Sequence, residues 1–189
     1  MTHTALLLID VQQSFCHRPY WLPAAAPHFL ERLNALIDAC AARGVPIVRV
    51  FHVEGPTRAE NPFAHESGLV RPLEGLRPVD AAFTVVKTRH SALAGTPLAA
   101  WLREQRIDRL IVSGIRTEQC CETTTRHASD EGWAVDFVDE ATLTFDMVSP
   151  AGNPVSATQL HERTQTVLHR RFAEVCGVDE AVARVDRPR

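Results

Sequence analysis

Short runs of β-branched residues and leucine alternate along this chain with longer segments in which apolar residues recur at helical spacing. This alternation is typical of βαβ units, in which helices join parallel strands and cover both faces of one sheet. It therefore predicts a doubly wound α/β fold with a mainly parallel sheet. The runs that we expect to form strands are Ala5–Ile9, Pro46–Val50, Phe83–Lys87, Leu110–Ser113, Ala134–Val138 and, with the weakest pattern, Ala173–Cys176.

Helix start and stop signals lie between these runs. Gly44 is placed to end a first helix, and Thr96-Pro97 has the pattern of an N-cap followed by proline at the first helical position. A third helix is predicted over about 118–131. Ser156 with Gln159 forms a capping-box pattern before a fourth. The apolar face of the first helix consists of Phe29, Leu33, Leu36, Ile37 and Cys40.

The composition is that of an ordinary globular protein. Of 189 residues, 45% are hydrophobic and 23% are charged, with 9 glycines and 12 prolines, which excludes collagen-like, low-complexity and disordered chains. A chain of this length fits one domain, and we expect residues 1–189 to form it. The formal net charge is −3, so no basic excess draws the chain to nucleic acid or to anionic lipid.

The N-terminal region and the cysteines indicate a compartment. The longest apolar stretch near the N-terminus, Ala5–Ile9, is far shorter than the roughly 20 residues of a membrane span, so we expect neither a signal peptide nor an anchor. The 5 cysteines are odd in number and include no CxxC pair, which disfavours a disulfide framework, a zinc ribbon or a thioredoxin-type site. We predict a reduced, cytoplasmic protein in which any functional thiol acts alone.

One stretch, from about Glu54 to Ala81, is rich in proline and glycine and is longer than usual connections between elements. Long irregular segments of this kind commonly carry function. We expect this loop to be either a lid over a functional site or a contact between subunits.

Reactive side chains follow three of the predicted strands. Asp10 comes directly after the first, Lys87 ends the third, and Cys120 lies shortly after the fourth. The carboxyl ends of parallel strands meet at one edge of a sheet, where open α/β proteins bind ligands. A cysteine at a helix start and near an ammonium group is expected to have a lowered pKa, and a carboxylate can take the thiol proton. The three residue types therefore indicate catalysis by a nucleophilic thiol.

Each of the three also has an ordinary structural explanation. An aspartate after a strand often caps a turn or helix, a lysine is usually solvated, and a cysteine is usually buried in the core. Spacing alone does not decide between these interpretations.

Three ordered motifs surround these residues. They are Leu8-Ile9-Asp10-Val11-Gln12 with Phe15, then Val86-Lys87 through Ser91-Ala92, then Gly114-Ile115-Arg116-Thr117-Glu118-Gln119-Cys120-Cys121-Glu122-Thr123-Thr124. Together with Gly132 and Asp139-Glu140-Ala141, they resemble the isochorismatase-like cysteine hydrolase superfamily in order and spacing, over nearly the whole chain.

The resemblance implies a catalytic triad of Asp10, Lys87 and Cys120 on a mainly parallel, six-stranded sheet in a three-layer sandwich. It also implies a non-proline cis peptide bond between Ile115 and Arg116, and an oxyanion hole formed by the backbone N–H groups of Arg116 and Cys120. No cofactor is implied. A homodimer or homotetramer is expected from the resemblance alone.

The chemistry implied is acyl transfer on a small amide, carbamoyl or ureide compound. Cys120 attacks the carbonyl, Asp10 passes the thiol proton to departing ammonia or amine, and water then releases the acid from the thioester. Lys87 stabilises charge and positions Asp10. Two alternatives stay open: an isochorismatase proper, which cleaves a vinyl ether without needing the thiol, and a non-catalytic protein that keeps the fold.

The chain departs from one metal-binding motif of this superfamily. Nicotinamidases carry Asp-x-His after the second strand and another His downstream, whereas this chain has Val50-Phe51-His52. Three ligands would have to come from His52, Glu54 and His65, which do not have dense ligand spacing. We therefore predict no metal site, with His52 lining the pocket or exposed.

Candidate substrate contacts are Phe15, Phe51, His52 and Arg116. A guanidinium beside the oxyanion site can bind a substrate carboxylate in a bidentate manner, which would favour acidic amides. The alternative is that Arg116 faces solvent or a neighbouring subunit. The aromatic residues that would either wall the pocket or join the core are Tyr20, Trp21 and Phe63, and those expected purely for packing are Cys16, Cys40, Cys121, Trp133 and Cys176.

Overall fold

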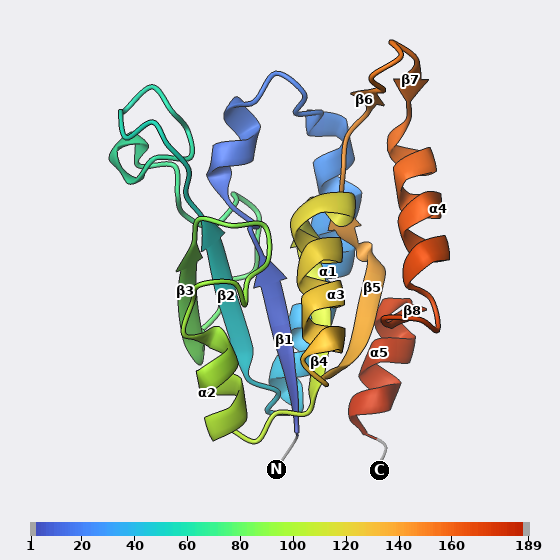
Figure 1. Ribbon diagram of the computed structural model, residues 1–189. Helices are drawn as coiled ribbons and strands as arrows, with labels where there is room; N and C mark the ends of the chain where they lie inside the picture. Colours follow the sequence, from blue (N-terminus) through green and yellow to red (C-terminus); the bar gives the residue numbers. More distant parts are fainter. Residues whose placement is uncertain (1–2, 187–189) are drawn as a thin grey trace.

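The computed structural model describes residues 3–186 and contains an open six-stranded sheet between helices (Figure 1). The strand order is β3-β2-β1-β4-β5-β8, and every neighbouring pair is parallel. This confirms the predicted α/β class. The strands of this sheet are β1 (Thr4–Ile9), β2 (Ile47–His52), β3 (Phe83–Lys87), β4 (Arg109–Ile115), β5 (Ala134–Leu143) and β8 (Glu174–Cys176).

Helices and a small hairpin complete the described part of the chain. The helices are α1 (Ala26–Ala42), α2 (Leu98–Glu104), α3 (Glu122–Asp130), α4 (Ala157–Leu168) and α5 (Val178–Val185). Shorter turns are the 3-10 segments η1 (Gln13–His17), η2 (Pro23–Ala25) and η3 (His65–Ser67) and the π-helical segment η4 (Thr117–Cys121). Strands β6 (Met147–Val148) and β7 (Pro154–Val155) form an antiparallel hairpin at one end of the molecule (Figure 1).

The alternation of side chains along β1 builds a core on each face of the sheet. Leu6 and Leu8 pack with buried residues of α1 and α5, whereas Leu7 and Ile9 pack with those of α2, α3 and α4. Successive side chains of a strand point to opposite faces, so a central strand covered on both sides must be apolar throughout. This explains why Ala5–Ile9, which forms most of β1, is a continuous hydrophobic run.

Most predicted boundaries lie within a few residues of the observed ones. The capping box of Ser156 and Gln159 is confirmed at the start of α4. Helix α2 begins at Leu98, one residue after the predicted start, and the Thr96 hydroxyl accepts a hydrogen bond from the backbone N–H of Leu98 at 3.3 Å. The sequence pattern did not predict the β6–β7 hairpin or the short helix α5, and β5 continues to Leu143 rather than ending at Val138.

The end of β4 lies unusually close to the end of β1. Gly114 has a φ of +125°, and a Cβ added there would lie 2.0 Å from the carbonyl oxygen of Ile9. Only glycine fits such an approach. The pairing of β4 with β5 also shifts register between Val112 and Gly114. This edge of the sheet is where the strand order reverses, which is the usual ligand-binding position in open α/β sheets.

The long 54–81 loop folds back on the segment that follows Asp10. The backbone N–H of Leu73 donates to the carbonyl of Val11 at 3.0 Å, and the Ser14 hydroxyl donates to the carbonyl of Leu69 at 3.1 Å. Its role as a lid or as a subunit contact stays a prediction.

Most of the residues expected purely for packing are buried. Cys40, Cys121, Cys176 and Trp133 are buried as expected, and Cys16 is half-buried against the core. Within residues 3–186, no helix has both the length and the apolar character needed to cross a membrane.

Candidate active site

Asp10 stands at the carboxyl end of β1 in an unusual backbone conformation. Its φ is +53°, in the left-handed region that aspartate tolerates better than bulkier residues. The backbone N–H donates to the carbonyl of Val50 at 2.9 Å, which continues the pairing of β1 with β2 by one residue. The side chain is fully buried. The turn therefore directs a carboxylate into the protein at the edge of the sheet.

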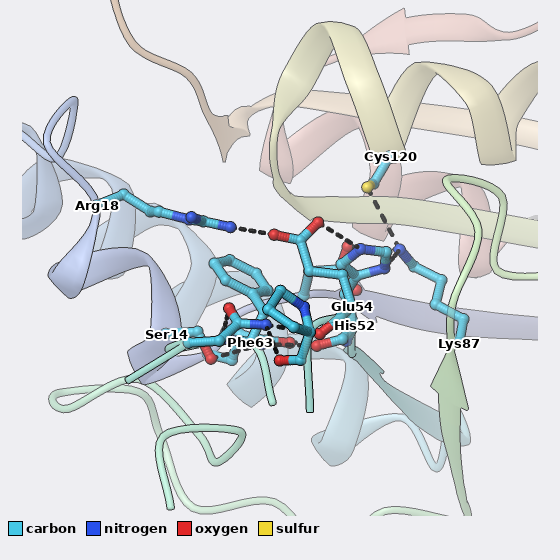
Figure 2. Close-up of polar contacts among 11 residues, drawn as sticks. Ser14, Arg18, His52, Glu54, Phe63, Lys87 and Cys120 are labelled. Atoms are coloured by element: carbon cyan, nitrogen blue, oxygen red, sulfur yellow. Dashed lines mark hydrogen bonds and ion pairs between the residues drawn. The ribbon is translucent and has the colours of Figure 1, made fainter. Parts of the chain in front are cut away.

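Lys87, the last residue of β3, reaches three acceptors with its buried ammonium group. The Nζ atom lies 2.7 Å from Asp10 Oδ2, 3.1 Å from His52 Nδ1 and 3.3 Å from Cys120 Sγ. Figure 2 shows Lys87 between His52 and Cys120. The structure thus brings together the three residues that the sequence singled out for catalysis.

Cys120 lies in the π-helical segment η4, which precedes helix α3. Such π-helical turns occur often at functional sites. The Ile115–Arg116 peptide bond before it is cis, as the resemblance implied. The carbonyl of Arg116 accepts hydrogen bonds from the backbone N–H groups of Gln119 at 3.2 Å and Cys121 at 3.1 Å, which tightens the turn. Cys120 itself is 7% exposed, so the thiol faces the interior of the site.

Burial dominates the electrostatics of this site. It raises the pKa of Asp10, although Lys87 opposes that shift. Burial acts to lower the pKa of Lys87, but Asp10 and Cys120 outweigh it and the pKa is raised. The pKa of the Cys120 thiol is raised by burial and by the nearby Asp10 carboxylate. The expectation of a lowered thiol pKa is therefore wrong: the resting thiol keeps its proton beside a carboxylate that can take it.

His52 connects the triad to a second group of charged side chains. Its Nε2 atom lies 3.7 Å from Glu54 Oε2, and Glu54 forms an ion pair with Arg18 (Figure 2). The ring of Phe63 meets the imidazole edge-on, with 5.9 Å between ring centroids. Burial, together with the charge of Lys87, lowers the pKa of His52 from 6.5 to about 3. The imidazole is therefore neutral at ordinary pH.

Arg116 is buried and already has an acidic partner. Its Nη2 atom lies 3.0 Å from Glu118 Oε1, and both side chains are 9% exposed. The guanidinium also lies over the ring of Tyr20, 5.0 Å from the centroid, and 5.7 Å from that of Phe145. Arg116 therefore does not face open solvent in this chain, and its role as a substrate contact or as a contact with a neighbouring subunit stays a prediction.

The two aromatic candidates lie in different surroundings. Phe15 is buried in the segment after Asp10 and packs edge-to-face on Phe63, with ring centroids 5.0 Å apart. Phe51 pairs in register with Val86, one residue before the His52–Lys87 pair. Because side chains alternate along a strand, Phe51 points to the opposite face of the sheet from His52. Phe51 therefore lies on the other face of β2 from the contact between His52 and Lys87, and its role as a substrate contact stays a prediction.

The possible metal ligands do not converge. His65 and Glu54 line one cavity of about 310 Å³, formed mostly by residues of the 54–81 loop, whereas His52 contacts Lys87 through Nδ1 and Glu54 through Nε2. Within the described residues, no group of at least three His, Cys, Asp or Glu side chains is arranged to hold a metal ion.

Sequence reasoning missed the acidic partners Glu54 and Glu118 and the contact between His52 and Lys87. The predicted second strand ended at Val50, so the sequence did not indicate that His52 and Lys87 pair in register at the ends of β2 and β3. Lys87 is also the only lysine of the chain, and all the other residues in the Lys+Arg count are arginine.

Comparisons with known proteins identify the family of this chain. The family model described as Isochorismatase domain matches residues 4–180. Streptothricin hydrolase from Streptomyces noursei is 30% identical over 154 residues, which cover 82% of this chain and 54% of that protein. Nicotinamidase 3 from Arabidopsis thaliana is 27% identical over 193 residues, covering 93% of this chain and 85% of the relative.

A solved structure with a similar fold points to the same family. A candidate isochorismatase from Burkholderia xenovorans LB400 superimposes with a TM-score of 0.86 at 33% identity, over 98% of this chain and 88% of that chain. The family model spans nearly the whole chain, and the six-stranded parallel sheet agrees with it. The chain belongs to the isochorismatase family and is a hydrolase of that family.

Proposed function

We propose that this hydrolase cleaves the C–N bond of a small amide, carbamoyl or ureide compound through a thioester on Cys120. The observation that carries the proposal is the buried contact set at the sheet edge, where Lys87 Nζ lies 2.7 Å from Asp10 Oδ2 and 3.3 Å from Cys120 Sγ. A nucleophile, a base and a cation in one site are the groups that acyl transfer needs. Relatives named nicotinamidase and streptothricin hydrolase support this class of reaction.

In the first half of the reaction, Asp10 takes the thiol proton as the Cys120 sulfur bonds to the carbonyl carbon. The N–H groups of Arg116 and Cys120 are the proposed donors to the oxyanion, a contribution worth about 10²–10³ in rate per donor. The protonated Asp10 then gives its proton to the leaving nitrogen, which departs as ammonia or amine. In the second half, Asp10 removes a proton from water, and the hydroxide released attacks the thioester. The acid leaves, and the proton returns to the sulfur.

The substrate contacts that we propose are Phe15 and Arg116, whereas the His52 imidazole contacts Lys87. Because Arg116 pairs with Glu118, the two side chains together carry no net charge. A neutral group that both donates and accepts hydrogen bonds, such as a carboxamide or a ureide, suits this pair better than a carboxylate does. We therefore propose a neutral substrate in place of the acidic amide expected from Arg116 alone.

The adjacent cysteines provide a matched test. Ammonia release is measured across a panel of small amides and ureides with the wild type, Cys120→Ala and Cys121→Ala. We expect Cys120→Ala to lose all turnover and keep its circular dichroism spectrum, and Cys121→Ala to keep activity, because that thiol is buried in the core. Full activity in Cys120→Ala would contradict the proposal.

A further inference from the structure

The Lys87 ammonium has one acceptor for each of its protons. A lysine side chain carries three N–H donors and no acceptor. Here Asp10, Cys120 and His52 lie 2.7, 3.3 and 3.1 Å from Nζ. Asp10 and Cys120 belong to the proposed triad, so their contacts with Lys87 are explained by the reaction. The contact with His52 is not, and an imidazole in this position needs a reason of its own.

The backbone of His52 is held in place independently of Lys87. The Gln12 side-chain carbonyl accepts from the His52 backbone N–H at 2.8 Å, and the Gln12 side-chain amide donates to the His52 carbonyl at 3.0 Å. Gln12 is itself fully buried, two residues after Asp10. The segment that presents the catalytic carboxylate therefore also anchors the residue that contacts the catalytic ammonium.

The contacts on both sides of the ring select one tautomer. Because an ammonium group can only donate, His52 Nδ1 must offer its lone pair to Lys87, and the proton of the neutral ring then lies on Nε2. Nε2 faces Glu54 Oε2 at 3.7 Å, an acceptor that favours a proton there. Glu54 is held by Arg18, whose guanidinium lies over the Phe63 ring, 4.7 Å from its centroid.

We propose that His52 is a positioning residue that orients the Lys87 ammonium by accepting its third hydrogen bond, with Glu54 stabilising the tautomer that this requires. The proposal rests on the role of Lys87 in the proposed function. A neutral acceptor directs an N–H without competing for the positive charge that Asp10 and Cys120 need. Losing it leaves a buried, charged donor without a partner, which penalises the charged form of Lys87.

The single lysine of the chain allows a direct measurement. Lysine labelled at Cε and Nζ gives one side-chain NMR signal, that of Lys87, whose pH titration is followed in the free enzyme. In His52→Asn, the amide oxygen can replace Nδ1 as the acceptor, whereas His52→Leu has none. We expect the Lys87 titration to move to lower pH by about one unit in His52→Leu, and to stay near that of the wild type in His52→Asn.

Kinetic measurements on the same variants provide a second test. We expect kcat to fall about 10- to 100-fold in His52→Leu with a smaller change in KM, and to recover substantially in His52→Asn. His28→Asn is the matched control, because the His28 side chain is 76% exposed on α1 and lies outside the site.

Two results would overturn the proposal: an unchanged Lys87 titration in a folded His52→Leu, or equal shifts in the Leu and Asn variants. The NMR arm needs no substrate, so it stays informative if no amide is hydrolysed. An absence of amide hydrolysis would count against the proposed function and not against the role of His52.

Discussion

Asp10 and Lys87 form an ion pair that is sealed from solvent, with 2.7 Å between Oδ2 and Nζ and 0% exposure of both side chains. A buried charge is tolerated only with a partner, because its desolvation is otherwise uncompensated. Asp10 directly follows β1 and Lys87 ends β3, and β2 lies between these strands, so the pair connects the ends of two strands that are not neighbours in the sheet. The contact on which the proposed catalysis depends is therefore expected to affect stability as well.

Breaking this pair on one side is expected to destabilise the fold. Lys87→Met removes the cation at nearly constant volume, and we expect the free energy of unfolding to fall by about 3–5 kcal/mol at neutral pH. Adding Asp10→Asn to Lys87→Met should recover part of that loss, because no unpaired charge then remains. Urea denaturation of the single and double variants measures both effects. A single variant as stable as the wild type would show that the pair is not sealed.

Because β4 approaches β1 so closely, we expect Gly114 not to tolerate substitution by any larger residue. Gly114→Ala places a methyl group 2.0 Å from the Ile9 carbonyl oxygen, and we expect more than about 4 kcal/mol of destabilisation or no folded protein. Gly132→Ala is the control, since its φ is +93° and no atom lies within 4 Å of the added Cβ. That change should cost only about 1–2 kcal/mol. Thermal unfolding compares the two, and equal costs would contradict so close an approach of the two strands.

The neutral His52 predicts a pH dependence of stability. Its pKa is about 3 in the folded chain and 6.5 ordinarily, so the unfolded chain binds a proton in this window that the folded chain does not. Stability contributed by His52 is then complete above 6.5 and is lost as the pH falls towards 3. The slope is at most about 1.4 kcal/mol per pH unit.

The measurement is the free energy of unfolding of the wild type, His52→Asn and His28→Asn across this range. Comparison with the wild type cancels the contributions of Asp10 and other groups. We expect a flatter dependence only in His52→Asn, and a slope equal to that of the wild type there would be inconsistent with a buried neutral imidazole.

The Arg116–Glu118 pair predicts which substrates react. With both charges present, neutral amides should be hydrolysed faster than carboxylate-bearing ones. Glu118→Gln removes the negative charge at nearly constant shape, and we expect the ratio of kcat/KM for anionic over neutral substrates to rise about tenfold or more. An unchanged ratio would place the pair outside the substrate pocket.

Much of the site was predictable because parallel strands align their carboxyl ends. Asp10 and Lys87 follow apolar runs whose type and direction the sequence pattern indicates, and the motif around Cys120 places the thiol at the same edge. The protonation state of the thiol was not predictable in this way. The helix start and the ammonium group argue for a lowered pKa, but the depth of burial, which dominates, is a property of the folded chain.

The acidic partners of His52 and Arg116 could not be predicted from the sequence, for a different reason. Glu54 and Arg18 lie in irregular segments, where no periodicity indicates which way a side chain points. Glu118 lies in a π-helical turn, and the regular helix expected there would have directed its side chain differently. The extension of β5 to Leu143 follows a change in register that leaves no alternating pattern in the sequence.

Trapping the acyl-enzyme tests the central claim most directly. An amide from the panel that releases ammonia is mixed with the enzyme, the reaction is quenched with acid within the first turnovers, and the mass of the intact protein and of its peptides is determined. We predict an added acyl mass on the peptide that carries Cys120, absent in Cys120→Ala and present in Cys121→Ala. Turnover by Cys120→Ala, or an acyl group mapped to any other residue, would contradict a thioester mechanism at this site.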